Sequence, residues 1–368
     1  MTPLNIFNTY IDNVAFHKVN EALNSTFLSE GKLVKEFEDK LSNEFGLKNP
    51  VAVNSGTSAL HLALIVAGVQ QGDEVICPAQ TFVASALVIL QQGAVPVFAD
   101  ICYESGNINS KDIESSITKR TKAIMVVHWG GYPCDMEEII LIAKKNNLIV
   151  IEDAAHAFGA TYKNKPIGAM SDITCFSFQA IKQVTTGDGG AICCVDQIMS
   201  ASARKKRWFG IDRKNSPASL LGERQYNLTE IGYKYHLNDY AAALGLANLE
   251  NYKARLNRRI KFAESYRKNF IHLDGITLFE NKSDRQNAYW LFGMHVKKRD
   301  AFVKAMKSRG VIASVVHQRI DRNKIFGGIK NDLVNQTKFD STQIHIPIHD
   351  GLNEEKIEYI IDAIKKGW

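Results

Sequence analysis

One lysine of the sequence, Lys182, lies where its amine could act as a nucleophile. It belongs to the stretch FSFQAIKQVTTGDGGAI, residues 176–192, and follows a strand-like run at 174–178. A glycine-rich turn and a second strand-like run at 191–195 come after it, so we expect Lys182 on a connection between two strands. Lysines in such places often extend into water along their alkyl stems. Beside apolar surface, burial would instead lower the pKa of the amine and free it to attack carbonyl carbons, which makes Schiff-base chemistry the hypothesis to test.

A second group of polar residues precedes a predicted helix. The segment NSGTSAL, residues 54–60, runs from a polar turn into an apolar helical pattern. The backbone N–H groups there, with Gly56 and the hydroxyls of Thr57 and Ser58, would lie at a helix N-terminus, which is a position suited to phosphate. The same pattern is also that of an ordinary N-cap, and the motif alone leaves both interpretations open.

Three further side chains follow predicted strands. Asp153 ends the most apolar strand-like run, LIVIED at 148–153. A carboxylate there could cap a helix, or it could hold a cationic heterocycle, because an aspartate beside a pyridine nitrogen favours the protonated ring. His156 by itself indicates little, since most histidines near a core satisfy a local hydrogen bond. Phe82 follows the strand-like run at 74–78 and could pack in the core or stack on a flat ligand.

The elements expected to position these residues alternate along the chain from about Gly56 onward. Their apolar strands are typical of a sheet buried on both faces by crossover helices, so we predict a parallel-rich α/β domain. Ligands of such sheets bind near the carboxyl ends of the strands, which here are Pro78, His128 and Asp153. The predicted helices are 59–68, 82–92 and 136–146, and the predicted strands are 74–78, 95–100, 122–128 and 148–153.

After about residue 250 the pattern changes. A long polar helix at 251–270 is expected, followed by a strand at 289–296 and helices at 301–309 and 354–366. We therefore predict a large α/β domain over 1–250, including the N-terminal segment, and a smaller C-terminal α+β domain over 251–368. No internal repeat and no low-complexity segment is apparent.

The composition is that of an ordinary globular protein. The 368 residues carry a formal net charge of +6 from 45 basic and 39 acidic residues, and 45% of them are hydrophobic. One basic cluster, RKKR at 204–207, is expected to be a solvated helix face, with an anionic-substrate site or a nucleic-acid patch as the alternatives. Since no segment resembles a nucleic-acid-binding module, no nucleic-acid partner is predicted.

The six cysteines show neither a CxxC pair nor zinc-ligand spacing, and several lie in apolar strand-like runs. They are expected to be buried, reduced thiols, which predicts no metal site and a cytoplasmic location. The N-terminal MTPLNIFNTYIDN lacks a basic start followed by an apolar core, and no uninterrupted apolar span is long enough to cross a bilayer. Neither secretion nor a membrane partner is expected.

Taken in order, these motifs resemble the fold-type I pyridoxal-phosphate enzymes, and within them the nucleotide-sugar aminotransferases of the DegT family. The resemblance covers nearly the whole chain. Its motifs are NSGTSALHLAL at 54–64, GDEVICPAQTFVASA at 72–86, EDAAHAFGATY at 152–162, FSFQAIKQVTTGDGGAI at 176–192, IGYKYHLNDYAAALGLANL at 231–249 and IPIHDGL at 346–352.

The resemblance implies a pyridoxal 5′-phosphate cofactor and a role for each matching residue. Lys182 would form the Schiff base, Asp153 would contact the pyridine nitrogen, and His156 would lie near the phenolic oxygen. Phe82 would stack on the ring, and the residues implied at the phosphate are Gly56, Thr57, Ser58 and Ser177.

Two positions depart from the family pattern. Where relatives often carry asparagine and arginine in a GYNYR-like segment donated by the second subunit, this chain has Lys234 and His236. Lys234 could still serve a phosphate, as a point charge. Gln179 stands where many relatives have histidine, which leaves its role open.

The activity implied is a ping-pong transfer of an amino group from L-glutamate to a nucleotide-linked keto-deoxy-sugar, with Arg213 and His317 as candidate substrate contacts. Within the family, the motifs are most similar to those of perosamine-type enzymes. These enzymes convert a 4-keto-6-deoxyhexose to a 4-amino-4,6-dideoxyhexose, which is used for surface polysaccharide such as lipopolysaccharide O-antigen. A homodimer with shared active sites is implied as well. The nucleotide, the sugar stereochemistry and the choice of carbon 4 or carbon 3 stay open.

Two alternatives are considered. Some relatives dehydrate a keto-sugar at carbon 3, and in them a histidine replaces the Schiff-base lysine, so Lys182 argues against that activity. A non-enzymatic regulatory protein of the same fold would need no intact cofactor site.

Overall fold

The computed structural model describes residues 3–213 and 215–368, and its largest element is a seven-stranded sheet with the order β1-β9-β8-β5-β4-β2-β3. The strands from β8 through β5, β4 and β2 to β3 pair in parallel, whereas β9 pairs antiparallel with both β8 and β1. The sheet is therefore mixed and mostly parallel, as predicted. The strands are β1 (Pro50–Val53), β2 (Glu74–Pro78), β3 (Val95–Ala99), β4 (Thr121–Val127), β5 (Ile149–Asp153), β8 (Ile173–Ser177) and β9 (Gly190–Cys194).

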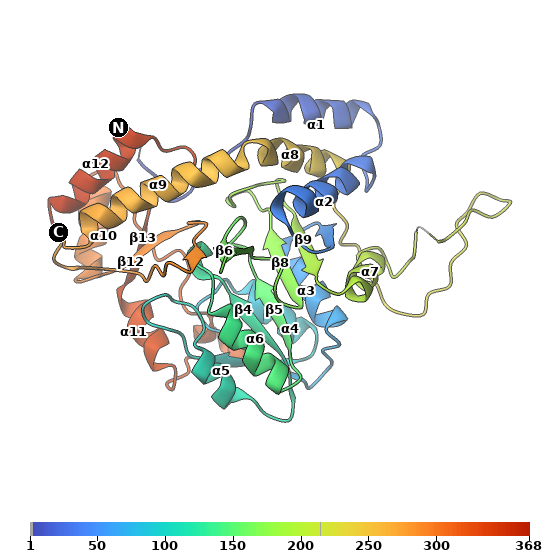
Figure 1. The fold of residues 1–368 in the computed structure, drawn as a ribbon, viewed down its shortest axis with the longest axis horizontal. Helices are drawn as coiled ribbons and strands as arrows, with labels where there is room; N and C mark the ends of the chain where they lie inside the picture. Colours follow the sequence, from blue (N-terminus) through green and yellow to red (C-terminus); the bar gives the residue numbers. More distant parts are fainter. Residues whose placement is uncertain (1–2, 214) are drawn as a thin grey trace.

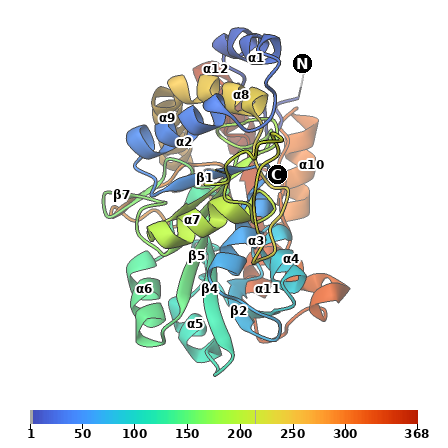
Figure 2. The ribbon, with the colours of Figure 1, turned by 90° about the vertical axis from the view of Figure 1, so that its right-hand side faces the viewer.

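Helices cover both faces of this sheet, which explains why its strands are apolar at nearly every position. Val150 belongs to the core on one face, and its neighbour Ile151 belongs to the core on the other. Figure 2 shows α6 and α3 on opposite sides of β4 and β5. One face packs against α2 (Lys32–Phe45), α5 (Ser110–Ser116), α6 (Met136–Lys145) and α8 (Asp239–Glu250), and the other packs against α3 (Gly56–Val66), α4 (Ala84–Gln91) and α7 (Gln197–Lys206).

The C-terminal part is built on a three-stranded antiparallel sheet with its own apolar core. The long helix α9 (Tyr252–Phe270) follows α8 and extends from the large sheet toward this part (Figure 1). The predicted boundary between residues 250 and 251 falls between these two helices, and it stays a prediction. The elements are β10 (Ile276–Leu278), β12 (Phe292–Val296) and β13 (Gln343–Ile346), with α10 (Arg299–Ser308), α11 (Val334–Thr342) and α12 (Glu354–Lys365).

Smaller elements connect the two parts. A short sheet of β6 (Thr161–Tyr162), β7 (Lys165–Pro166) and β11 (Arg285–Gln286) joins chain segments far apart in sequence. At the N-terminus, Leu4 pairs with Val311 before the chain reaches α1 (Val14–Asn24). The remaining short helices are η1 (Trp129–Gly131), η2 (Ile320–Arg322) and η3 (Lys324–Phe326).

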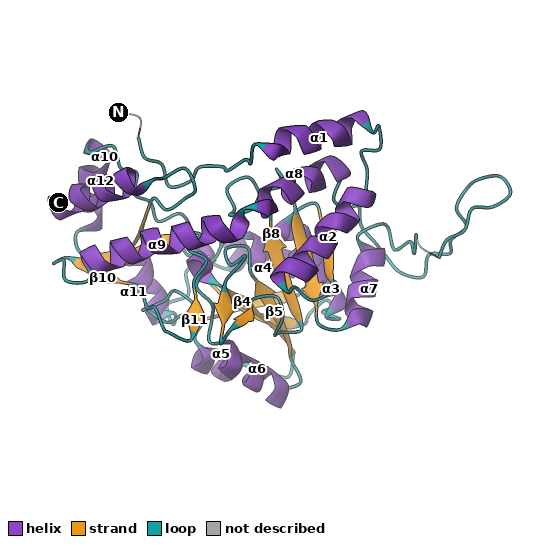
Figure 3. Ribbon diagram, turned by 45° about the horizontal axis from the view of Figure 1, so that its top comes forward, coloured by secondary structure: helices purple, strands orange, loops and turns teal. Residues whose placement is uncertain are grey.

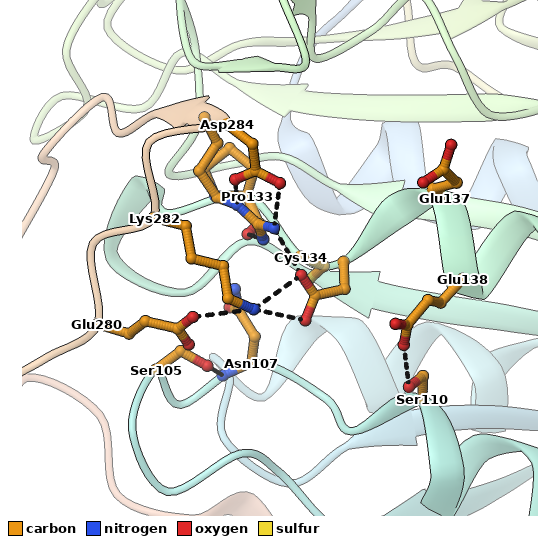
Figure 4. A network of polar contacts seen from close by, with 12 residues as sticks. Ser105, Asn107, Ser110, Pro133, Cys134, Glu137, Glu138, Glu280, Lys282 and Asp284 are labelled. Atoms are coloured by element: carbon orange, nitrogen blue, oxygen red, sulfur yellow. Dashed lines mark hydrogen bonds and ion pairs between the residues drawn. The ribbon is translucent and has the colours of Figure 1, made fainter.

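A network of ion pairs also links the segment around β11 to the loop before α6 (Figure 4). Asp135, just before α6, pairs with Lys282 at 3.2 Å and with Arg285 at 2.6 Å. Glu280 pairs with Lys282 at 2.9 Å, and Asp284 pairs with Arg285 at 2.7 Å. Because Arg285 is only 8% exposed, this network is partly shielded from solvent and fixes the start of the segment that leads to β12.

Between α7 and α8 the chain extends away from the body as a long irregular arm (Figures 1 and 3). Several large apolar side chains on this arm are exposed, among them Leu220, Leu221 and Ile231. Burial of apolar surface is favourable, so a segment of this kind is suited to contact with another protein surface.

Most predicted elements are present with ends shifted by a few residues, but two interpretations need correction. The strand predicted over 289–296 begins only at Phe292, because Tyr289 has a left-handed backbone with φ of +46° that a strand does not accommodate. The cluster 204–207 is a solvated helix face only in part: Arg204 and Lys205 are 43% and 44% exposed, whereas Arg207, just after α7, is 2% exposed and pairs with Glu38 at 2.5 Å and with Glu30 at 2.6 Å.

The cysteines match their prediction, since all six are free thiols and five of them are buried. Within the described part of the chain, the helices are all too short or too polar to span a membrane.

Candidate active site

A cavity of about 330 Å³ opens where β5 and β8 of the large sheet end. Its position is the one predicted for a ligand, because the carboxyl ends of parallel strands converge there. The predicted residues that line it are Gly56, Thr57, Phe82, Asp153, His156, Ser177, Lys182 and His317. Gln179 and Trp290 line it too, together with Ser55, Thr81 and Gly189.

The first wall is the N-terminus of α3. Ser55 caps the helix, because its Oγ accepts a hydrogen bond of 3.0 Å from the backbone N–H of Ser58. The Ser58 hydroxyl donates at 2.7 Å to Oδ1 of Asn54, so it serves the cap, and Ser58 is not among the lining residues. A Cβ added to Gly56 would lie 2.8 Å from Cβ of Ser177, so glycine is required for helix and strand to approach this closely. The first turn of α3 therefore presents backbone N–H groups with Thr57 to the cavity.

Asp153 stands at the end of β5 and is 6% exposed. Its Oδ2 accepts a hydrogen bond of 2.7 Å from Ser85, and its Oδ1 accepts one of 3.2 Å from the N–H of Ala155. Burial raises the pKa of Asp153, and these two hydrogen bonds together with the charge of Lys182 act in the opposite direction. The carboxylate is thus fixed in orientation and faces a cavity that contains an amine.

Lys182 lies on the connection between β8 and β9, as predicted. Its N–H donates to the carbonyl of Gln179 at 2.9 Å in a tight turn that directs the side chain into the cavity. Burial lowers the pKa of Lys182 to about 7, although the nearby carboxylate of Asp153 acts to raise it. A substantial fraction of this amine is therefore neutral near pH 7, which is the form that attacks a carbonyl carbon.

The opposite wall is aromatic. The rings of His156 and Trp290 stack with centroids 3.8 Å apart, and Nζ of Lys182 lies 3.8 Å from the centre of the Trp290 ring. His317 approaches Phe82 at 5.2 Å between centroids, so Phe82, which is 52% exposed, lines the cavity and is not core. Burial holds the pKa of His156 well below its usual range and lowers that of His317 to about 4, so both rings are neutral near pH 7.

Sequence reasoning missed Trp290 and Ser85. Trp290 falls in the run predicted as a strand over 289–296, and nothing in its spacing signals a site. Ser85 lies in the first turn of α4, three residues after Phe82, and its hydroxyl reaches Asp153 at the end of β5.

Besides Ser58, three other residues discussed from the sequence lie outside the cavity. Lys234 has its Nζ 3.6 Å from the centre of the Trp208 ring, at the base of the arm. Arg213 pairs with Glu30 at 3.6 Å and also stacks on Trp208. The ring of His236 packs on Trp208 at 4.2 Å between centroids. Within one chain, the structure therefore does not bring these residues to Lys182.

Pyridoxal 5′-phosphate fits the residues that are present. Gly56, Thr57 and Ser177 would hold its phosphate, Asp153 its ring nitrogen and Lys182 its reactive carbon. His156 has a buried Nδ1 without a hydrogen-bond partner among the described residues, which leaves it available to a polar group of a ligand. When bound, this cofactor supplies an electron sink for the α-carbon of an amino acid.

The comparisons with known proteins point the same way. Residues 9–365 match the profile of the DegT/DnrJ/EryC1/StrS aminotransferase family. A GDP-perosamine synthase of Escherichia coli O157:H7 is 40% identical over 274 residues, which cover 74% of this chain and 72% of that protein. The sugar aminotransferase CalS13 from Micromonospora echinospora is 30% identical and superposes with a TM-score of 0.94, covering 99% of this chain and 100% of that one.

A second solved structure bears on the cofactor. The putative sugar aminotransferase Spr1654 from Streptococcus pneumoniae, in its PLP form, is 27% identical with a TM-score of 0.91 and covers 99% of this chain and 98% of its own. Since the family profile spans nearly the whole chain and the cavity carries the residues that the cofactor requires, the chain belongs to the DegT/DnrJ/EryC1/StrS aminotransferase family and uses pyridoxal 5′-phosphate.

Proposed function

We propose that the protein transfers the amino group of L-glutamate to a nucleotide-linked keto-deoxy-sugar, most closely a 4-keto-6-deoxyhexose that becomes a 4-amino-4,6-dideoxyhexose. The observation that carries the proposal is the amine of Lys182, which has a pKa of about 7 and faces the same cavity as the buried carboxylate of Asp153. The likeness to a GDP-perosamine synthase supports the choice of sugar. The product would serve surface polysaccharide such as O-antigen.

Different residues of the chain would carry out different parts of the reaction. The amine of Lys182 can take a proton from the donor's α-carbon and later give it up, because its pKa near 7 makes both protonation states accessible. The carboxylate of Asp153 would keep a proton on the ring nitrogen beside it. Phe82 would stack on the cofactor ring, and His317, beside it in the cavity wall, would contact the sugar.

Two alternatives find less support. A dehydratase acting at carbon 3 of a keto-sugar would carry histidine in place of Lys182, and this chain has the lysine. A regulatory protein without catalysis would not require the buried amine and carboxylate that the cavity contains.

A homodimer with shared active sites is part of the proposal. The arm between α7 and α8 carries exposed Leu220, Leu221 and Ile231, and α1 exposes Phe16, which is consistent with surfaces that a second copy would cover. Lys234 and Arg213 lie at the base of that arm and outside the cavity of their own chain, so we assign them to the partner's site. The free, buried cysteines favour a cytoplasmic location.

The experiment that tests the activity is a panel of GDP-, dTDP- and UDP-linked keto-sugars, incubated with L-glutamate and the cofactor-loaded protein. We expect one sugar to be aminated, with 2-oxoglutarate formed in equal amount, both measured by mass spectrometry. The Lys182→Ala variant is the matched control and should form neither. Release of 2-oxoglutarate with no amination of any sugar in the panel would overturn the proposed acceptor but not the family.

A further inference from the structure

Trp290 contacts both Lys182 and His156 in the cavity, and neither the proposed cofactor contacts nor the proposed reaction assigns it a role. Its ring lies 3.8 Å from Nζ of Lys182, stacks on His156 at 3.8 Å with an interplanar angle of 17°, and stacks on Phe7 at 5.0 Å. The side chain is 2% exposed. It is therefore a fixed surface against which the reactive amine is placed.

Two connections hold this ring in a fixed position relative to Lys182. The indole Nε1–H donates a hydrogen bond of 2.9 Å to the carbonyl of Ile181, the residue before the lysine. In the segment that precedes Trp290, Lys282 and Arg285 form ion pairs with Asp135 in the loop before α6. A shift of the Lys182 loop relative to Trp290 would strain this hydrogen bond, so the bond couples the position of the ring to that of the lysine.

We propose that Trp290 is a positioning residue for Lys182: its ring face receives the ammonium form of the lysine when the amine is not covalently engaged. An ammonium within about 6 Å of an indole face is attracted by the ring quadrupole, most strongly where water is excluded. The neutral amine gains much less from the same contact. Trp290 thus offsets part of the free-energy cost of desolvating the charged amine, and it stabilises the amine in one defined location.

The location matters for the proposed transamination, on which this inference rests. A freed lysine that must take up and give back a proton at the reacting atoms has to stay close to them, and its long side chain has many rotamers that would take it elsewhere. A ring face 3.8 Å from Nζ restricts this freedom without forming a hydrogen bond that would compete for the amine's lone pair. The imidazole of His156, stacked on the same ring, is held in place at the same time.

The sign of the electrostatic effect provides the test. Burial lowers the pKa of Lys182 to about 7, and loss of the ring's attraction for the ammonium form should lower it further. Removal of a cation–π contact of this class should lower the pKa of the lysine by about 0.5 to 1.5 units. A purely steric role for Trp290 predicts no such dependence on the electron density of the ring.

The experiment replaces Trp290 by mono-, di- and trifluorinated tryptophans through nonsense suppression. Fluorination withdraws electron density from the ring face and changes its size little. The pKa of Lys182 is read in the full-length, cofactor-free protein from the pH dependence of its acylation by acetic anhydride, with the labelled peptide quantified by mass spectrometry. We expect the pKa to fall stepwise with each fluorine.

Trp208 supplies the matched control, because Lys234 lies 3.6 Å from its ring centre in the same kind of contact, outside the cavity. Fluorination at Trp208 should leave the acylation profile of Lys182 unchanged. A profile of Lys182 that does not move through the whole series at Trp290 would overturn the proposal. So would an equal shift from Trp208. Neither result depends on the sugar substrate, so failure of this proposal can be distinguished from failure of the proposed function.

Discussion

The hydroxyl of Ser85 donates a hydrogen bond of 2.7 Å to Oδ2 of Asp153, and this links α4 to the end of β5 inside the cavity. The bond holds the carboxylate in one orientation at the wall of the cavity. Because Asp153 is 6% exposed, its negative charge is weakly screened and acts strongly on a neighbouring cation. The first prediction therefore tests whether the carboxylate of Asp153, held by Ser85, stabilises a positive charge on the ligand.

Asp153→Asn should lower kcat and kcat/KM together by about 100-fold or more, because an amide of the same shape no longer favours a protonated ring nitrogen in the transition state. Steady-state kinetics with saturating glutamate measures both constants. Ser85→Ala is the control: it removes one hydrogen bond and should cost about tenfold. A change confined to KM for the sugar would make Asp153 a substrate contact.

Lys182→Ala should abolish transamination, a loss of about 10⁴-fold or more, while the protein still folds and binds the cofactor through its phosphate contacts. Lys182→Arg should not rescue it, since a guanidinium stays protonated. Turnover is measured by 2-oxoglutarate release, and binding by the visible absorbance of the cofactor after gel filtration. Appreciable turnover of Lys182→Ala without added amine would contradict the assignment.

The stability of the cofactor-free protein should reveal the burial of Lys182. Its pKa is about 7 when folded against 10.5 when unfolded, so folding opposes protonation. The resulting cost is fully present below pH 7, declines as the pH rises, and vanishes above about 10.5. Lys182→Met should therefore stabilise the fold by on the order of 2–4 kcal/mol at pH 7, and by progressively less toward pH 10.

Urea unfolding at several pH values measures this difference. The control is Lys119→Met, a change of the same chemistry at an exposed position, which should show little effect at any pH. A gain from Lys182→Met that is the same at pH 7 and pH 10 would mean that packing, and not the buried charge, is its cause.

Mixing inactive Lys182→Ala subunits with inactive Lys234→Glu subunits should regenerate activity if the arm completes the partner's site. After random exchange, half of the dimers are mixed and each has one intact site, so about a quarter of the wild-type activity is expected. Charge reversal is used because it should repel a phosphate. Mixed dimers are verified by tag capture, and their formation without activity would remove Lys234 from the partner's site.

Arg207→Met should destabilise the fold by about 3–5 kcal/mol, because it leaves the carboxylate of Glu38 buried with one fewer cation. Arg204 would still pair with Glu38 at 2.7 Å, which limits the loss. The neighbouring Lys206→Met is the control, since its partner Glu230 is exposed and the change should cost less than about 1 kcal/mol. Denaturant unfolding of both variants decides the comparison, and equal losses would contradict a structural role for Arg207.

Much of the site was predictable because its parts are local. Gly56 with Thr57, Asp153 and Lys182 each follow or precede a recognisable strand or helix, and in a parallel sheet the ends of such elements converge. Trp290 could not be predicted in this way. It reaches the cavity from the C-terminal part of the chain, and its contact with Lys182 depends on a left-handed turn at Tyr289 and on the ion pairs around Asp135.

The sequence by itself determined the α/β class, the order of the strands along the chain and which lysine lies on the connection that lines the cavity, because these depend on apolar periodicity and on short motifs. Only the tertiary structure decided which charges are buried. RKKR at 204–207 has the composition of a solvated surface, yet Arg207 lies in the interior because Glu38 and Glu30, about 170 residues earlier, converge on it. Long-range pairing of this kind has no local signature, since it arises from packing between α2 and the end of α7.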